Sequence, residues 1–183
     1  QDLFVTNGAI RSFNHSDYTL NTEDLIGQTF WDVWKETPPR PEENLAFQNV
    51  GDLKFEKRGD EWGLNDVGVS HGIACGDLDG DGDLDLVVTH IGKPVSIYRN
   101  ESSEPLVRVD LKGTDRNTGG AGARLILRSG GEIQTATVRP SSGYLTTTAS
   151  GITFGLGEHS VVGQLEVKWP DGRVQVVKNL KAG

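Results

Sequence analysis

Sulfur-containing and aromatic residues are scarce in this chain of 183 residues, which has no Met, a single Cys and only 7% Phe, Trp and Tyr. The lone Cys75 cannot form a disulfide within the chain, so no cystine framework supports the fold. No apolar run approaches the roughly 18 residues of a membrane span, which excludes a spanning helix. The apolar segment of a signal peptide is also missing and the chain begins at Gln1, so we expect any targeting segment to have been removed.

Basic residues are outnumbered, with 18 Lys and Arg against 26 Asp and Glu, and they are unevenly distributed. Residues 1–106 carry 8 basic and 20 acidic side chains, whereas residues 107–183 carry 10 and 6. Neither half contains the basic stripe interleaved with stacking aromatic residues that is typical of nucleic-acid binding, so we expect none. The uneven charge predicts two modules.

Short runs of β-branched and apolar residues are separated by turn residues, and helical periodicity is scarce. Residues 2–8 echo residues 85–90, which favours repeated β-units of the kind that form propeller blades. In the second half, Leu165, Val167 and Trp169 share one face of a strand that turns at Asp-Gly 171–172, a strong hairpin signal. These patterns predict strands throughout.

A long insertion at residues 9–44 interrupts the first half. Its segment 22–35 predicts one short helix with Thr22 as N-cap, on which Trp31 and Trp34 share a packing face. The prolines that follow end this helix.

Five aspartates occur within nine residues in the segment 77–85, Asp-Leu-Asp-Gly-Asp-Gly-Asp-Leu-Asp. Their mutual repulsion makes a turn without a cation a poor explanation. Carboxylate oxygens are hard ligands that suit Ca²⁺, and the two glycines allow the positive φ angles that wrap a backbone around an ion. The spacing predicts a calcium loop with these ligands: the side chains of Asp77, Asp79, Asp81 and Asp85, and the backbone carbonyl of Asp83.

An EF-hand begins with the same spacing, but it requires a bidentate Glu at its twelfth position, which is Val88 here. Residues 86–89 are Leu-Val-Val-Thr, which is typical of a strand rather than of an exiting helix. We therefore favour a cation held between two strands of a hairpin, with a metal-free acidic turn as the alternative. A catalytic carboxylate pair is disfavoured because general acid–base catalysis needs two carboxyls in different environments across a cleft.

Two ordered sets of motifs resemble known domains. Residues 51–100 resemble one FG-GAP/VCBS repeat through Gly-Asp-Leu-Lys-Phe at 51–55, Gly-Asp-Leu-Asp at 76–79 and Tyr-Arg-Asn at 98–100. Residues 107–181 resemble an ASPIC/UnbV domain through Gly-Ala-Arg at 122–124, Phe-Gly-Leu-Gly at 154–157 and Trp-Pro-Asp-Gly at 169–172. This pairing is typical of the cartilage acidic protein family.

The resemblance implies an extracellular or periplasmic β-propeller followed by a β-sandwich, and no settled biochemical activity. It also implies a calcium role for five side chains: Asp77, Asp79, Asp81, Asp83 and Asp85.

We therefore predict an all-β protein in which a partial β-propeller-like calcium-binding repeat is followed by a β-sandwich or barrel-like domain. The repeat region covers residues 1–100, with the insertion at 9–44. A linker at 101–106 leads to the second domain at 107–183.

Two other features have simple explanations. Arg58-Gly59-Asp60 spells an integrin-binding tripeptide, which turn composition explains without a receptor. Tyr144 and Trp169 offer ring faces on which a sugar can stack, but we favour packing for both.

We expect a non-enzymatic calcium-binding structural or adhesion module that mediates protein assembly or matrix interaction. Its expected location is secreted, extracellular or at the cell surface, with the periplasm as a further option. Open strand edges at residues 2–7 and in the second domain favour a protein partner, a homo-oligomer or a filament. A glycan-binding module and an accessory part of a secreted propeller enzyme stay open as alternatives.

Overall fold

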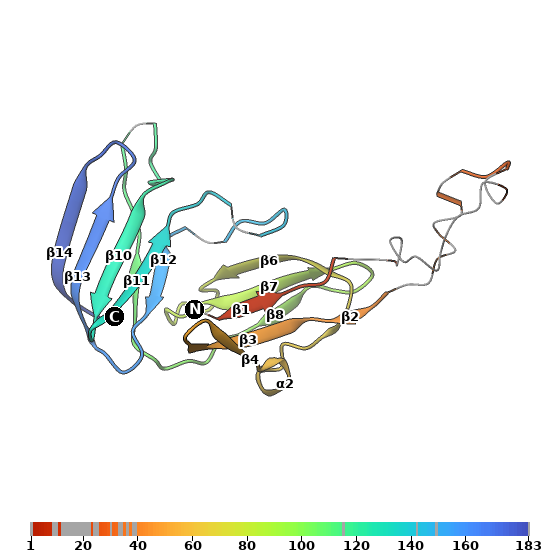
Figure 1. Ribbon diagram of the computed structural model, residues 1–183, viewed down its shortest axis with the longest axis horizontal. Helices are drawn as coiled ribbons and strands as arrows, with labels where there is room; N and C mark the ends of the chain where they lie inside the picture. The colour runs from red at the N-terminus through yellow and green to blue at the C-terminus, as the bar shows by residue number, and fades with distance from the viewer. Residues whose placement is uncertain are drawn as a thin grey trace. The chain divides into compact units, whose positions relative to one another are not determined.

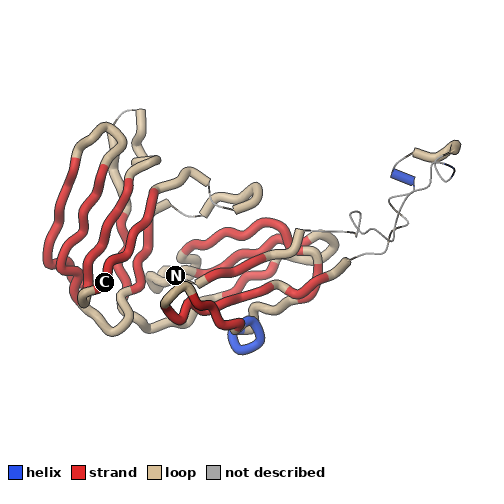
Figure 2. The backbone as a smooth tube through the Cα atoms, in the orientation of Figure 1, coloured by secondary structure: helices blue, strands red, loops and turns tan. Residues whose placement is uncertain are grey.

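The computed structural model divides the chain into two compact units, unit 1 with residues 1–72 and 88–96 and unit 2 with residues 73–87 and 97–183. Strands dominate both units (Figures 1 and 2), which confirms the predicted all-β class. None of the helices formed by the described residues is long and apolar enough to span a membrane. The structure describes residues 2–8, 11, 23, 26–29, 31–32, 35, 37, 40–114, 116–141, 143–148 and 150–182.

An antiparallel sheet in unit 1 has the strand order β1-β3-β4, with β1 at Leu3–Val5, β3 at Leu45–Gly51 and β4 at Lys54–Lys57. The β3–β4 turn is unusual because Asp52 and Leu53 have φ angles of 51° and 58°. A two-residue type I′ turn requires positive φ at both central positions, and its twist matches that of the flanking strands.

A second, two-stranded sheet of unit 1 pairs β2, Glu42–Glu43, with β5, Val67–Gly68. Between β4 and β5 lies the short helix α2, Gly59–Trp62, which ends at Gly63 in the left-handed conformation.

The Arg-Gly-Asp tripeptide lies at the start of α2. Arg58 is the N-cap residue and forms ion pairs with Glu56 and Glu61, while Gly59 is buried. The Asp60 carboxylate accepts a hydrogen bond from the Asn65 amide. The two charged ends of the tripeptide are therefore engaged within the chain.

The third sheet has the order β6-β7-β8, with β6 at Ser70–Gly76, β7 at Asp85–His90 and β8 at Ser96–Tyr98. Residues 86–89 thus form a strand, as their β-branched composition predicted, and Val88 is completely buried. The acidic loop joins β6 to β7. The boundary between the two units passes through these strands, and the predicted linker at 101–106 stays a prediction.

Six strands of unit 2 form two sheets: β9 (Leu106–Val109) pairs with β12 (Ile152–Gly155), and the other four strands follow the order β11-β10-β13-β14. The bounds of these four are Arg124–Ser129 for β10, Glu132–Thr137 for β11, Val161–Lys168 for β13 and Val174–Lys181 for β14. The predicted hairpin at residues 171–172 joins β13 to β14.

One apolar core lies between these two sheets. Phe154 comes from the two-stranded sheet, whereas Leu125 and Leu127 come from the four-stranded sheet, and all three are almost completely buried. Leu165, Val167 and Trp169 are buried as their alternation predicted. The two sheets of this part of unit 2 therefore share one apolar core, the arrangement expected of the predicted β-sandwich or barrel-like domain.

Much of the insertion, including Thr22 and Trp34, lies outside the described residues. Its described part contains a helix start in which the Thr29 hydroxyl and the Asp32 carboxylate each accept a hydrogen bond from the other residue's backbone N–H. This reciprocal arrangement is a capping box. The hydrogen bonds from Thr29 and the nearby Lys35 lower the pKa of Asp32 to about 2.

Candidate functional site

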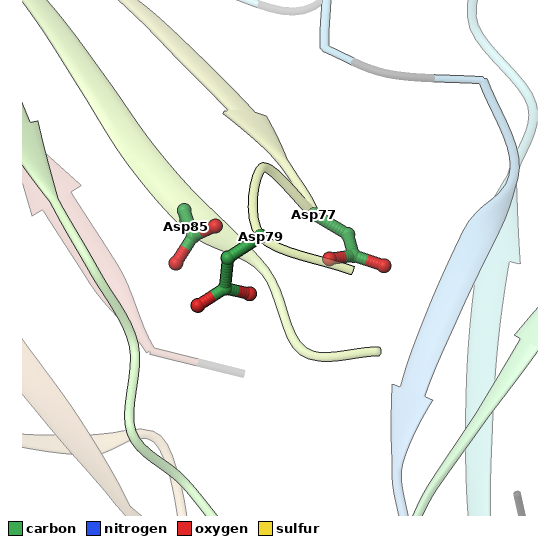
Figure 3. Close-up of side chains that lie close together, drawn as sticks. All are labelled: Asp77, Asp79 and Asp85. Atoms are coloured by element: carbon green, nitrogen blue, oxygen red, sulfur yellow. The ribbon is translucent and has the colours of Figure 1, made fainter. Parts of the chain in front are cut away.

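The loop between β6 and β7 gathers three carboxylates. Asp77 directly follows β6, Asp85 begins β7, and Asp79 lies in the loop between them (Figure 3). One oxygen atom from each of the three side chains lies within 4.8 Å of the others. The hairpin thus converts an alternating spacing in the sequence into a compact cluster of oxygen atoms.

Hydrogen bonds from backbone N–H groups to aspartate side chains shape this loop. The Gly80 N–H donates to Asp77 Oδ1 at 2.7 Å, and the Asp83 N–H donates to Asp81 Oδ1 at 3.1 Å. Gly80 and Gly82 have φ angles of 82° and 100°, a region that side-chain-bearing residues rarely adopt. The glycines therefore allow the tight winding that brings the first and last aspartates together.

Asp85 is the most firmly held of the three carboxylates. It is almost completely buried, and its two oxygens accept hydrogen bonds from the Leu78 N–H at 2.8 Å and the Asn100 N–H at 2.9 Å. These two N–H groups hold the pKa of Asp85 below its ordinary value, because they stabilise the charged form. Asp85 therefore stays ionised and presents a fixed negative charge.

The remaining two aspartates of the loop are placed differently. Neither Asp81 nor Asp83 is part of the three-carboxylate cluster. Asp83 Oδ2 accepts a hydrogen bond from the Ser102 N–H at 3.1 Å, whereas its buried Oδ1 has no hydrogen-bond partner among the described residues. Burial raises the pKa of Asp83, and the charge of Asp81 raises it further.

Only one basic side chain forms an ion pair with the loop among the residues that the structure describes. Arg99 Nη1 lies 3.6 Å from Asp79 Oδ2, and the same guanidinium also pairs with Glu101, which raises the pKa of Arg99. One shared cation cannot neutralise five carboxylates, so the loop keeps an excess of negative charge. An all-oxygen, strongly negative donor set suits a hard divalent cation such as Ca²⁺.

Sequence reasoning missed the residues that anchor this loop from outside it. The backbone N–H groups of Asn100 and Ser102 donate to Asp85 and Asp83, respectively. The motif at 98–100 marked the segment, but backbone donors carry no signature of their own in a sequence.

A second polar cluster, in unit 1, was also not predicted. The His90 side chain is completely buried, with Nδ1 3.0 Å from Ser70 Oγ and Nε2 2.8 Å from Ser96 Oγ. Because Ser70, His90 and Ser96 lie on β6, β7 and β8, this cluster links the three strands and has a structural role.

The two aromatic residues considered for sugar stacking have different environments. Trp169 is buried in the apolar core of unit 2, its indole N–H donates to Gln175, and Arg173 lies over its ring, so the prediction of packing is confirmed. Tyr144 is 66% exposed, so it lies outside the core.

Comparisons with known proteins agree with the motifs of the second half. Residues 113–183, which contain strands β10 to β14, match the protein-family model described as ASPIC and UnbV. The chain is 34% identical to cartilage acidic protein 1 of Xenopus tropicalis over 116 residues, which is 58% of this chain and 17% of that protein. It is 31% identical to cartilage acidic protein 1 of Homo sapiens over 142 residues, which is 73% of this chain and 21% of that protein.

The chain thus spans about a fifth of the length of the curated relatives it matches. The FG-GAP/VCBS resemblance of residues 51–100 stays a prediction. The similarities support a relationship to the cartilage acidic protein family, with an ASPIC and UnbV domain at residues 113–183.

Proposed function

We propose that this chain is a calcium-stabilised, non-enzymatic structural module of a secreted protein, and that it takes part in protein assembly or matrix interaction. The observation that carries the proposal is the cluster of oxygen atoms from Asp77, Asp79 and Asp85 at the β6–β7 hairpin. Three carboxylates at this separation repel one another, and a divalent cation offsets that repulsion.

Calcium would be held by the side chains of Asp77, Asp79 and Asp85, with Asp81 and Asp83 as the further ligands that the spacing predicts. Once bound, the ion supplies a cross-link between the end of β6 and the start of β7. Asp85 contributes a carboxylate that its two backbone hydrogen bonds already orient. The role of the ion is therefore mechanical, because it fixes a turn that would otherwise be strained by like charges.

Calcium affinity bears on where the protein works. Extracellular calcium modules bind with dissociation constants of about 10⁻⁴–10⁻³ M, a range that cytosolic calcium does not fill. The similarity to cartilage acidic protein 1 fits a location outside the cell, since cartilage consists largely of extracellular matrix. We therefore place the module in a secreted or cell-surface protein.

Exposed sheet edges support the role in assembly. β1 and β14 each lie at the end of a sheet, and Leu3, Val174 and Val176 are among the exposed apolar side chains of these strands. Unpaired strand edges with apolar side chains favour pairing with another chain.

Isothermal titration calorimetry of the whole chain with CaCl₂ tests the proposal. We expect one calcium ion to bind, and binding to be lost in Asp79→Ala. The matched control is Asp110→Ala, which removes an exposed aspartate outside the loop and should leave calcium binding unchanged. No heat of binding to the unchanged chain, or equal affinity in Asp79→Ala, would contradict the calcium role.

A further inference from the structure

A groove in unit 2 runs along β9. Its volume is about 900 Å³, and it is lined by the whole of β9, by the preceding residues 102–105, and by parts of β13 and β14. Val177 and Leu180 of β14 add apolar side chains to its lining, with the buried Leu165 of β13 beneath. We call this feature the strand groove.

One edge of β9 faces away from its partner strand. The Leu156 N–H donates to the Pro105 carbonyl, and the register continues this pairing with Phe154 opposite Val107. Hydrogen-bonded and non-hydrogen-bonded positions alternate in an antiparallel pair, so the backbone N–H and C=O groups of Leu106 and Arg108 point away from β12. Within the described part of the chain, no other strand pairs with β9.

One end of the strand groove is acidic. Asp81, Asp83 and Glu104 line the groove near residues 102–105, and we call them the acidic end; Arg108, Asp110 and Lys181 line other parts of the groove. Asp83 Oδ1 is buried and has no hydrogen-bond partner among the described residues. A buried carboxylate oxygen without a donor is costly, and a cationic donor that reached it would supply a charge-assisted hydrogen bond.

We infer that the strand groove binds an extended β-strand of a partner protein, with apolar side chains at alternate positions and a basic side chain at the acidic end. The strand pairs with the free backbone groups of Leu106 and Arg108 and packs its apolar side chains on Val177 and Leu180. Backbone pairing supplies affinity, while alternate side chains supply specificity. This inference rests on the proposed assembly role and names the surface and the partner for it.

The test uses the whole chain and fluorescently labelled seven-residue peptides in which Val and Thr alternate. One peptide has a Lys at its amino end and another has it at its carboxyl end, because the direction of the added strand is not specified. We expect fluorescence anisotropy to show saturable binding of at least one peptide. Replacing its Lys by Glu should weaken binding about fivefold or more, as expected for a charge-assisted hydrogen bond.

Backbone pairing is tested separately from charge. Arg108→Pro removes an N–H that faces the groove, on an edge where Pro is tolerated, and should weaken peptide binding about fivefold. The matched control Arg108→Ala keeps that N–H and should bind within about twofold of the unchanged chain. N-methylation of alternate residues in the peptide provides a second test that leaves the protein unaltered, and it should weaken binding about tenfold or more.

Several results would overturn the inference. The first is that neither peptide binds at concentrations up to about 1 mM. The second is that N-methylation of the peptide leaves its affinity unchanged, and the third is that the Lys and Glu peptides bind with equal affinity. Sedimentation showing a dimer that the peptides do not dissociate, and that excludes them, would instead make a second copy the occupant. Because Asp81 and Asp83 also stand among the proposed calcium ligands, the peptide titrations are made in EDTA and calcium binding is measured on a separate sample without peptide. Calcium binding without peptide binding in EDTA refutes the groove alone, and the converse refutes the calcium role alone.

Discussion

Arg99 should compete with calcium for the acidic loop. Its Nη1 atom lies 3.6 Å from Asp79 Oδ2, and its side chain is 61% exposed. A calcium ion on Asp79 would feel repulsion from this guanidinium and would share the carboxylate with it. Removing the guanidinium in Arg99→Ala should therefore raise calcium affinity. Since exposed ion pairs are weak, the expected gain is about 1.5–5-fold.

Calorimetric titration of the Arg99→Ala variant with calcium at low ionic strength measures this gain. The matched control is Arg173→Ala, since Arg173 also pairs with a neighbouring aspartate, Asp171, but lies outside the loop. Raising the salt from about 0.01 M to about 1 M shortens the Debye length from about 30 Å to about 3 Å, so the gain should shrink. Weaker binding in Arg99→Ala would refute the reasoning, because it would mean that Arg99 positions the loop rather than competes for it.

Three further predictions concern stability. If the dissociation constant for calcium is about 10⁻⁴–10⁻³ M, calcium at about 10 mM should raise the free energy of unfolding by about 1.4–2.7 kcal/mol. Thermal unfolding should show this as a rise of several degrees in Tm, and EDTA should reverse the rise. Leu125 is completely buried, so Leu125→Ala should lower the free energy of unfolding, measured by urea denaturation, by about 2–5 kcal/mol. An equal loss from Ile133→Ala, at an exposed position, would contradict this account of the core. Hydrogen bonds from the Arg173 backbone and side chain hold the pKa of Asp171 below its ordinary value of 3.8. The ionised Asp171 therefore stabilises the folded state above pH 3.8, and this stabilisation is lost as the pH falls through the lowered pKa. Asp171→Asn should therefore lower Tm more at pH 6 than at pH 2, and an equal change at both values would refute this.

Local sequence patterns predicted the strands and hairpins because both are determined by neighbouring residues. The alternation of Leu165, Val167 and Trp169 predicted one buried face, and the Asp-Gly pair at 171–172 predicted the turn that follows. The composition of residues 86–89 distinguished a strand from the helix of an EF-hand in the same way.

Sheet order could not be predicted in this way. β9 pairs with β12 across a long stretch of chain that contains β10 and β11, and no local signal specifies that partnership. Such pairings depend on how apolar faces pack in three dimensions. The strand groove depends on this sheet order, so it too was invisible in the sequence.

The candidate site was predicted only as a set of residue types. The spacing predicted one ion held by the side chains of Asp77, Asp79, Asp81 and Asp85 and by the backbone carbonyl of Asp83. The structure brings oxygens of Asp77, Asp79 and Asp85 together, while the roles of Asp81 and Asp83 stay predictions. Turn conformation, which spacing alone does not specify, determines where each carboxylate points. Likewise, the sequence could not separate the buried Trp169 from the exposed Tyr144, since both are aromatic residues in a β-rich region.

A crystal structure of the chain grown with calcium, with anomalous diffraction recorded at a wavelength where calcium scatters strongly, tests the calcium account most directly. The account predicts a single strong anomalous peak in the β6–β7 loop, bonded to carboxylate oxygens of Asp77, Asp79 and Asp85. An empty loop, or an anomalous peak bonded to other residues while these three carboxylates stay unliganded, would contradict it.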